Sequence, residues 1–419
     1  MGPSTLRGSL AAPPSKSYTH RALVVGYLAG RTYRVENPLE SGDTLATARG
    51  LESLGASIRR TGRVWTVRTG AGRVPGRAAP IECGESGTTL RFLLPLAARG
   101  SRRVRFVGSR RLGERPLRPL LRVLEGAGTT VVSGGPGRTI AEVTGPLNPV
   151  RAQLDVSESS QFLSALLFAL PTLSGPSTLR LRSAPVSRPY VEATLRVLLA
   201  SHIEVDWQGR TIRIPAPQAY AGSRLRVPGD ASSAAYLWAA GAVSAGAVEV
   251  RGVDRSWPQA DLLILDIFRT MGATVRGRRS SVEVSGPLTS PIRVDLDEAP
   301  DLLPLVSVLA ACVPRSSRIE GARHAAGKES DRRAESARLA RALGATVALD
   351  ARRLEIRGTS HPRPIRYSGP ADHRLVMSAA VGALAATSES VVDHADAVAK
   401  SYPEFWTAVR RLGGSLTVR

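Results

Sequence analysis

Lysine is nearly absent from this sequence. Three of its 57 basic residues are lysines, Lys16, Lys328 and Lys400, and the other 54 are arginines. An ammonium group is a compact charge whose pKa burial can tune, whereas a guanidinium is a planar fork that stays protonated. A composition that favours arginine should keep lysine only where arginine cannot replace it. All three lysines lie in short runs rich in Ser, Arg, Asp or Glu, so we interpret them as site residues, with chance survival on a solvated surface as the alternative.

Cysteine and long apolar runs are also scarce. Cys83 and Cys312 are too few for a disulfide framework or a cysteine-based metal site, so we expect two small buried side chains and no metal. The longest apolar run, residues 302–313, contains Pro304 and is too short to cross a bilayer. The N-terminal residues lack a basic stretch followed by an apolar segment. We therefore expect a cytoplasmic protein with no membrane partner.

The net charge of +22 does not by itself indicate a nucleic-acid-binding protein. Nucleic-acid binders concentrate their cations on one stripe or tail and add aromatic side chains that stack on bases. Aromatic residues make up only 5% of this chain, and the arginines occur in scattered pairs such as Arg59-Arg60 and Arg102-Arg103. We expect instead a positive field that attracts small anionic substrates, and we keep nucleic-acid binding as an alternative.

One pattern recurs six times along the chain, with copies 69 to 74 residues apart. The end of an apolar helix is followed by a pivot residue and then by a strand pattern. The pivots are Gly55, Gly128, His202, Gly272, Gly344 and Gly413. Glycine at five of the six positions favours a left-handed helix C-cap, a conformation that His202 should adopt less easily.

The segment after most pivots alternates between polar and apolar residues around a polar turn, as in residues 273–284 and 345–357. This alternation predicts hairpins. Because 419 residues are too many for one ordinary core, six copies of a strand–helix unit predict an α/β protein with two three-copy domains. A solenoid is the structural alternative, although a period of roughly 70 residues exceeds the usual solenoid repeats.

Polar clusters stand at the predicted helix starts in nearly every copy. They comprise residues 14–21, 84–91, 157–161, 229–233, 328–332 and 372–374. Unpaired backbone amides and the helix dipole favour a bound phosphate or carboxylate there. A single cluster would more simply be an N-cap, but the coincidence of these clusters with the lysines favours an anion-binding site.

Two carboxylates lie among these cations. Glu329 follows Lys328, and Asp301 follows Pro300 at the head of an apolar helix predicted over residues 302–311. A carboxylate pair among cations suits proton transfer, whereas isolated carboxylates would be caps or salt bridges.

These motifs, in this order, resemble the 5-enolpyruvylshikimate-3-phosphate synthase family, the enolpyruvyl transferases of the shikimate pathway. The resemblance covers essentially the whole chain. It rests on residues 16–21, 84–88, 114–116, 159–161, 187–190, 229–233, 300–301, 328–332, 372–374 and 400–403. It implies a two-domain enolpyruvyl transferase fold, an inside-out α/β barrel with three βαβαββ repeats per domain. Residues 1–14 and 229–419 would form one discontinuous domain and residues 15–228 the other, with the active site in the cleft between them.

The resemblance also implies an activity: transfer of the enolpyruvyl group of phosphoenolpyruvate to the 5-hydroxyl of shikimate 3-phosphate, with release of phosphate. The enzyme would be a monomer that needs no cofactor and no metal. Its catalytic residues would be Asp301 as base, Glu329 as carbon acid and Lys16, which could share either role. Shikimate 3-phosphate would be bound by Lys16, Ser17, Arg21, Ser159, Ser160, Gln161, Ser187, Asp301 and Lys328. Phosphoenolpyruvate would be bound by Lys16, Gly87, Arg115, Gln161, Arg332, Arg374 and Lys400.

The chain departs from the family pattern just before Lys328. Ala325-Ala326-Gly327 stands where the family usually carries an arginine two positions before the lysine, and His324 replaces an asparagine of some members. Gly87 retains the small residue that members sensitive to glyphosate carry, so the resemblance implies a glyphosate target.

A sister family that transfers enolpyruvate to UDP-N-acetylglucosamine is the nearest alternative. Its mobile loop usually carries a cysteine, and the corresponding residues 108–115 have none. Lys16-Ser17 also differs from that family's Lys-Asn pair, so we expect the shikimate enzyme.

Overall fold

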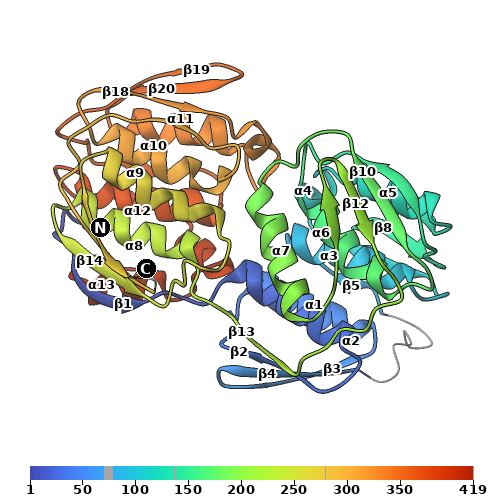
Figure 1. Cartoon of the computed structure of the whole chain (residues 1–419). Coiled ribbons are helices and arrows are strands. Elements are labelled where there is room, and N and C mark those ends of the chain that lie inside the picture. The colour runs from blue at the N-terminus through green and yellow to red at the C-terminus, as the bar shows by residue number, and fades with distance from the viewer. Residues whose placement is uncertain (70–78, 136–137, 279, 419) are drawn as a thin grey trace. The chain divides into compact units, whose positions relative to one another are not determined.

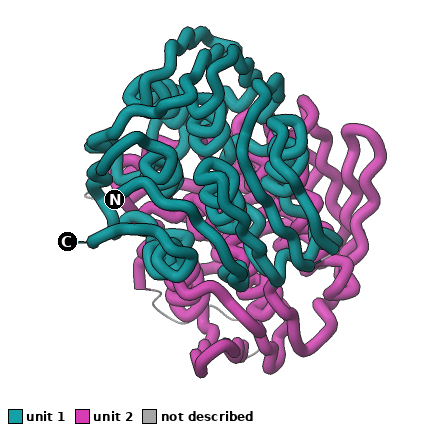
Figure 2. The backbone as a smooth tube through the Cα atoms, turned by 90° about the vertical axis from the view of Figure 1, so that its left-hand side faces the viewer, with its two compact units in different colours: residues 1–13, 228–419 teal, residues 14–227 magenta. Residues whose placement is uncertain are grey.

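The computed structural model describes residues 1–69, 79–135, 138–278 and 280–418 (Figure 1). The chain divides into two compact units (Figure 2): unit 1 contains residues 1–13 and 228–419, and unit 2 contains residues 14–227. The alternation of helices and strands in both units confirms the predicted α/β class.

Unit 2 contains three four-stranded sheets, each of which pairs two parallel strands with an antiparallel hairpin. The first sheet has the order β13 (Arg224–Arg226), β2 (Tyr33–Glu36), β4 (Val64–Thr69) and β3 (Ala56–Thr61). The second has the order β5 (Ile81–Glu82), β6 (Val104–Val107), β8 (Thr139–Thr144) and β7 (Thr130–Ser133). The third has the order β11 (Asp206–Gln208), β12 (Thr211–Ile214), β10 (Ser177–Leu181) and β9 (Arg151–Leu154).

The helices of unit 2 fall into two sets. Three inner helices are buried on nearly all sides: α1 (Lys16–Leu28), α3 (Gly87–Ala98) and α6 (Gln161–Ala169). The outer helices are α2 (Gly42–Ser53), α5 (Arg118–Gly126) and α7 (Arg188–Ala200), and the short elements are α4 (Arg110–Gly113) and η1 (Leu170–Thr172). A helix that is buried all round needs apolar residues on every face, and the apolar runs of α3 and α6 supply them.

Unit 1 repeats this plan with one difference in its third copy. Its first sheet has the order β1 (Arg7–Ala11), β14 (Ala247–Arg251), β16 (Ser281–Ser285) and β15 (Thr274–Arg278). Its second has the order β17 (Arg293–Asp295), β18 (Ser316–Glu320), β20 (Arg353–Arg357) and β19 (Thr346–Leu349). Its third contains two strands, β21 (Arg366–Tyr367) and β22 (Val391–Val392). Over the described residues no hairpin follows the pivot Gly413, and the Ser415 carbonyl accepts a hydrogen bond from the Gly2 backbone instead (2.9 Å).

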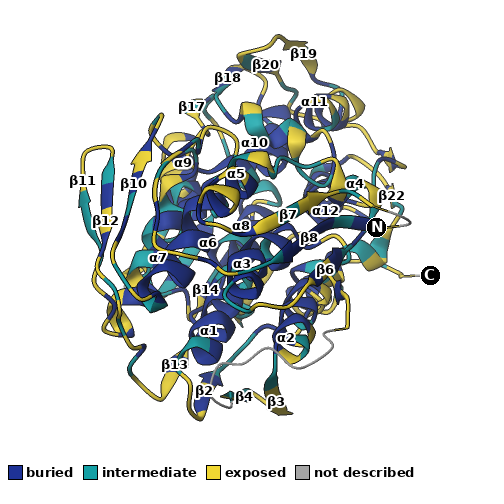
Figure 3. Ribbon diagram, turned by 90° about the vertical axis from the view of Figure 1, so that its right-hand side faces the viewer, coloured by how far each residue is buried: buried dark blue, intermediate teal, exposed yellow. Residues whose placement is uncertain are grey.

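The inner helices of unit 1 are α8 (Ala231–Val243), α10 (Leu303–Ala311) and α12 (His373–Ala385), which contact one another. Its outer helices are α9 (Ile264–Thr270), α11 (Arg332–Ala342) and α13 (Phe405–Arg411). Four 3₁₀ turns complete it: η2 (Ala260–Leu263), η3 (Pro300–Leu302), η4 (Arg323–Gly327) and η5 (Ala395–Lys400). Figure 3 colours most of α3, α6 and α8 as buried, so the core of each unit is a set of helices beneath its sheets.

The predicted pivots and hairpins are confirmed. All six pivots have positive φ, from 58° at His202 to 99° at Gly55 and Gly413. Both predicted hairpins form, as β15 with β16 and β19 with β20. His202 adopts the left-handed conformation despite its side chain. The stabilisation gained by ending the helix with this C-cap therefore exceeds the cost of the strained backbone at His202. Among the described residues, no helix is long and apolar enough to cross a membrane.

Candidate active site

The polar clusters lie at helix starts, as predicted: five of the six precede inner helices, and residues 328–332 precede the outer helix α11. In unit 2, α1 begins at Lys16, α3 at Gly87 and α6 at Gln161. In unit 1, α8 and α12 begin after the capping carboxylates of Asp230 and Asp372. Each inner helix therefore presents free backbone amides beside serine, aspartate or arginine side chains.

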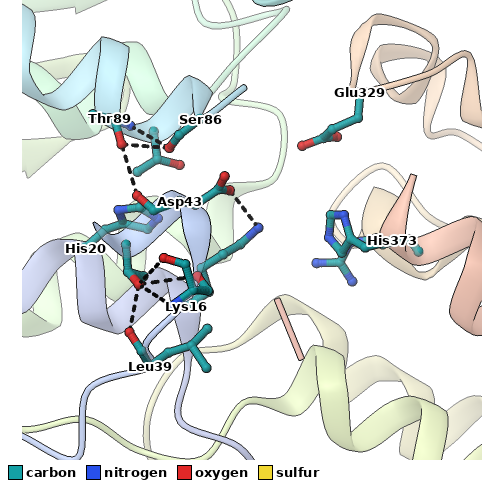
Figure 4. Close-up of polar contacts among 12 residues, drawn as sticks. Lys16, His20, Leu39, Asp43, Ser86, Thr89, Glu329 and His373 are labelled. Atoms are coloured by element: carbon teal, nitrogen blue, oxygen red, sulfur yellow. Dashed lines mark hydrogen bonds and ion pairs between the residues drawn. The ribbon is translucent and has the colours of Figure 1, made fainter. Parts of the chain in front are cut away.

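Lys16 is held by an acid that the sequence did not single out. Its Nζ lies 3.2 Å from Oδ2 of Asp43, which stands at the start of α2 (Figure 4). The Asp43 carbonyl lies 3.3 Å from the hydroxyl of Thr89, which in turn lies 2.7 Å from Ser86 Oγ. These contacts fix the starts of α1, α2 and α3 to one another. Asp43 was missed because an acid after Ser41-Gly42 is typical of an ordinary helix start.

A buried histidine extends this network. His20 Nδ1 lies 2.7 Å from the Thr47 hydroxyl, and Thr47 lies 2.7 Å from the Thr89 hydroxyl. Burial lowers the pKa of His20 to about 3, so the imidazole is neutral at physiological pH. The network beneath Lys16 therefore adds no further positive charge to the site.

Arg21 is buried and bonded only to neutral acceptors. Its guanidinium donates to Thr194 Oγ1 (3.0 Å), to the Ser17 carbonyl (2.8 Å) and to the Tyr190 carbonyl (2.7 Å). Burial lowers its pKa to about 10. Within the described residues no carboxylate forms an ion pair with Arg21. A buried guanidinium without a counter-ion is an attractive partner for an anionic ligand.

Arg91 joins α3 to α6. It donates to Gln161 Oε1 (2.7 Å) and to the Pro116 carbonyl (2.7 Å), and Gln161 Nε2 donates to Thr88 Oγ1 (3.1 Å). Gln161 thus lies between two inner helices with its orientation set by Arg91. The contact with Pro116 also fixes the residue that follows Arg115.

Gly87 lies against the arginine expected to bind phosphoenolpyruvate. A Cβ placed on Gly87 would lie 3.0 Å from the Arg115 guanidinium carbon. This distance is tighter than ordinary van der Waals contact, so a larger residue would displace Arg115. The absence of a side chain at position 87 therefore sets the position of Arg115.

The four predicted serines occupy helix starts, and Ser17 is the second residue of α1. Ser159 Oγ accepts a hydrogen bond from the Gln161 amide (3.3 Å), and Ser160 is buried at the N-cap of α6. Ser187 is buried at the N-cap of α7 with a φ of 52°. A left-handed conformation at a non-glycine residue is strained, and such strain concentrates at functional sites.

In unit 1, Arg332 gathers three acids around one guanidinium. Nε and Nη2 donate to the two oxygens of Asp372 (2.8 and 3.1 Å), Nη1 donates to Asp301 (2.7 Å), and Nη2 also donates to Glu329 (2.8 Å). Arg332 is 1% exposed. Because Asp301, Glu329 and Asp372 come from different elements, Arg332 brings the two predicted catalytic carboxylates to the same place.

Asp301 also faces Arg374 and Lys328. Arg374 Nη2 lies 2.7 Å from Asp301 Oδ2, and Lys328 Nζ lies 3.8 Å from Oδ1. Burial raises the pKa of Asp301, but Arg374, Lys328 and Arg332 outweigh that effect and hold it well below its usual range. Asp301 is therefore an ionised acceptor in the substrate-free chain.

A further acid, Asp261, lies behind Arg374. Its Oδ2 is 3.7 Å from Arg374 Nη1 and accepts the Ser232 hydroxyl, and it is 1% exposed. Burial raises its pKa to about 6. Sequence reasoning missed Asp261 because it lies outside the polar clusters, in the 3₁₀ turn η2.

The stretch that departs from the family pattern forms the turn η4. Lys328 follows this turn, and its amide donates to the Ala325 carbonyl (3.4 Å). Burial, aided by Lys328, lowers the pKa of His324 to about 4. His324 is thus a neutral neighbour of Lys328, as an asparagine would be.

The predicted site residues therefore fall into two groups. Unit 2 carries Lys16, Ser17, Arg21, Gly87, Arg115, Ser159, Ser160, Gln161 and Ser187. Unit 1 carries Asp301, Lys328, Glu329, Arg332, Arg374 and Lys400, the last residue of η5. Over the described part of the chain, no three His, Cys, Asp or Glu side chains form a group that could hold a metal ion.

Solved structures define the class of fold. EPSP synthase from Acinetobacter baumannii matches with a TM-score of 0.82 and 24% identity, over 98% of this chain and 97% of that chain. The enolpyruvyl transferase NikO from Streptomyces tendae matches with a TM-score of 0.77 and 20% identity, over 99% and 96%. The chain thus has the two-domain fold of enolpyruvyl transferases.

Sequence comparison identifies the family. The model of the EPSP synthase (3-phosphoshikimate 1-carboxyvinyltransferase) family matches residues 1–409, and the chain belongs to this family. A 3-phosphoshikimate 1-carboxyvinyltransferase of Halobacterium salinarum is 39% identical, over 99% of this chain and 98% of the relative. One from Thermococcus kodakarensis is 38% identical, over 97% and 98%.

Proposed function

We propose that this chain is a 3-phosphoshikimate 1-carboxyvinyltransferase, which transfers the enolpyruvyl group of phosphoenolpyruvate to the 5-hydroxyl of shikimate 3-phosphate and releases phosphate. The observation that carries the proposal is the family match over residues 1–409, together with relatives 38–39% identical along nearly their whole length. The proposed pathway is that of aromatic amino acid biosynthesis.

Unit 2 supplies the cations that suit the phosphate of shikimate 3-phosphate. Arg21 is buried without a carboxylate partner, so an anionic ligand would supply its missing counter-charge. We assign this substrate to Lys16, Ser17, Arg21, Ser159, Ser160, Gln161 and Ser187, with Asp301 and Lys328 from unit 1.

Phosphoenolpyruvate carries a carboxylate and a phosphate, which arginine forks bind bidentately. We assign it to Lys16, Gly87, Arg115, Gln161, Arg332, Arg374 and Lys400. Arg332 and Arg374 already bind carboxylates in the substrate-free chain. Phosphoenolpyruvate must therefore compete with, or share, these internal partners.

The chemistry requires two proton transfers. Asp301 accepts the proton of the 5-hydroxyl of shikimate 3-phosphate as the hydroxyl oxygen attacks C2 of phosphoenolpyruvate. Glu329 delivers a proton to the methylene carbon of phosphoenolpyruvate. Lys16 can serve either step. The resulting tetrahedral intermediate expels phosphate and loses a methyl proton. This step restores the carbon–carbon double bond and gives the enol ether product. The substrate anions neutralise Arg374 and Lys328, which removes the charges that depress the pKa of Asp301 and so makes it a better base.

We also propose that residues 1–14 with 229–419, and residues 15–228, act as the two catalytic domains of a cytoplasmic monomer. Light scattering coupled to size-exclusion chromatography tests the monomer: a mass of 44.4 kDa supports it, and a multiple of that mass contradicts it.

Phosphate release from phosphoenolpyruvate tests the activity. We expect turnover with shikimate 3-phosphate as acceptor and none with UDP-N-acetylglucosamine in a parallel assay. Turnover only with the sugar nucleotide would reject the assignment. Filter binding of an oligonucleotide at two salt concentrations tests the nucleic-acid alternative, which requires a steep loss of affinity with salt.

A further inference from the structure

Arg374 lies between two carboxylates that come from different repeats. Its Nη2 is 2.7 Å from Asp301 Oδ2, and its Nη1 is 3.7 Å from Asp261 Oδ2. The Arg374 amide also donates to the capping Asp372 (3.0 Å), so its backbone is fixed at the start of α12. Only the side chain can turn, and both carboxylates act on its direction.

Asp261 is itself held in place from two sides. The Ser232 hydroxyl in the first turn of α8 donates to its Oδ2. Two residues before it, Gln259 accepts the Ala231 amide (2.9 Å) and donates to the Gly229 carbonyl (2.9 Å). The segment 259–261 is thus locked to the start of α8, and it presents the Asp261 carboxylate to Arg374 as a fixed element.

The placement of Asp261 is costly for stability. The side chain is buried, its Oδ1 has no hydrogen-bond partner among the described residues, and two further acids, Asp301 and Asp230, act on it electrostatically. A buried charge with an unsatisfied oxygen destabilises a fold. A neutral asparagine could accept the same Ser232 hydrogen bond, so stability alone does not explain an aspartate here.

We propose that Asp261 is a positioning residue for phosphoenolpyruvate binding. Its charge holds Nη1 of Arg374 away from Asp301, so that the guanidinium keeps one edge directed toward the substrate. Without that charge, Arg374 pairs with Asp301 through both of its terminal nitrogens, which removes the phosphoenolpyruvate contact and weakens Asp301 as a base. This inference rests on the proposed function, because it takes Arg374 as a phosphoenolpyruvate ligand.

The test compares Asp261→Asn with the wild-type enzyme. We expect KM for phosphoenolpyruvate to rise about tenfold and kcat to fall, while KM for shikimate 3-phosphate stays within about twofold and the melting temperature at pH 7.5 does not fall. If Asp261 served folding alone, its substitution would lower the melting temperature and would not change one KM value relative to the other. An unchanged KM for phosphoenolpyruvate in the active variant, or an equal rise in both KM values, overturns the proposal.

A second variant and a control complete the experiment. Ser232→Ala removes only the hydroxyl that orients Asp261. We expect KM for phosphoenolpyruvate to rise about threefold while KM for shikimate 3-phosphate stays the same. If KM for phosphoenolpyruvate does not rise in this variant, the proposal is overturned even if Asp261→Asn does not fold. Glu142→Gln is the matched control, because Glu142 stands on β8 and pairs with Arg103, neither of which is an assigned residue, and we expect wild-type constants. Wild-type turnover is measured first, so its absence would count against the proposed function and not against the role of Asp261.

Discussion

Two buried arginines of unit 2 and two of unit 1 are held in opposite ways. In unit 2, Arg21 and Arg91 donate to hydroxyl, amide and carbonyl oxygens. In unit 1, Arg332 and Arg374 are held by carboxylates. The first arrangement leaves positive charge available for an anion, whereas the second satisfies it internally.

This difference separates two tasks. Neutral acceptors orient a guanidinium without cancelling its charge, so unit 2 is suited to binding. A network of acids and bases couples each group's protonation to its neighbours, so unit 1 is suited to proton transfer that responds to substrate. The comparison predicts that loss of Asp301 or Glu329 in unit 1 mainly changes kcat, while loss of Arg21 in unit 2 mainly changes affinity.

The largest effect is expected from the carboxylates of unit 1. Asp301→Asn and Glu329→Gln should bind both substrates and turn over at least about a hundredfold more slowly, because each removes a group that we propose transfers a proton. Substrate affinity, turnover and melting temperature are measured on each variant. The control is Asp331→Ala, which removes the cap that accepts the Arg333 and Ala334 amides and should lower stability by about 1 kcal/mol with near-normal turnover. If Asp301→Asn behaves like this control, Asp301 is a cap and another group is the base.

The lysines test whether charge alone is sufficient. Lys16→Arg and Lys400→Arg keep the charge but replace a compact ammonium with a planar group, and we expect at least a tenfold loss in kcat/KM, about 1.4 kcal/mol. For Lys16, the 3.2 Å pair with Asp43 leaves little room for a longer head. Near-normal activity in either variant would mean that the lysine persists by chance and is not needed at the site. Glu192→Gln, which removes the charge of an exposed ion pair with Arg188, serves as the neutral surface control.

Gly87→Ala should separate inhibitor from substrate in unit 2. The added methyl would lie 3.0 Å from the Arg115 guanidinium carbon, closer than van der Waals contact, so we expect a severalfold rise in KM for phosphoenolpyruvate and a larger rise in the inhibition constant for glyphosate. Both constants come from steady-state inhibition assays. Unchanged inhibition would mean that position 87 does not line the site.

The smallest effect concerns the pH dependence of stability. Burial, opposed by Arg374 and reinforced by Asp301 and Asp230, raises the folded-state pKa of Asp261 to about 6, above its unfolded value near 3.9. The stability that this group contributes is present below about pH 4 and is lost as pH rises through about 6. Asp261→Asn should therefore match the wild type near pH 4 and melt at a higher temperature above pH 6.5. A constant difference across this range would contradict the raised pKa.

Local signals in the sequence predicted much of this structure. The six pivots and the helix starts could be located because a left-handed C-cap and an N-cap depend on a few neighbouring residues. The same reasoning placed Asp301 at a helix head and Lys328 and Arg332 at another.

Contacts between distant repeats could not be predicted in the same way. The meeting of Asp301, Glu329 and Asp372 on Arg332 requires η3, α11 and α12 to converge, and no spacing in the sequence encodes that convergence. Asp43 and Asp261 were missed for the same reason, because their partners Lys16 and Arg374 are distant in the sequence. The missing hairpin after Gly413 also depends on a distant partner, since Ser415 bonds to Gly2 and Ser4.

The pairing of β1 with β14 has a consequence for biosynthesis. Residues 7–11 leave the ribosome before unit 2, but their parallel partner begins at Ala247, after all of unit 2. At about 5 to 20 residues per second, the first strand waits roughly 10 to 50 s for that partner. Unit 2 has by then been synthesised in full, and it closes on itself through β13 and β2. A deletion of residues 7–11 should therefore impair unit 1, which is completed after unit 2, and spare unit 2, which follows these residues directly in the chain.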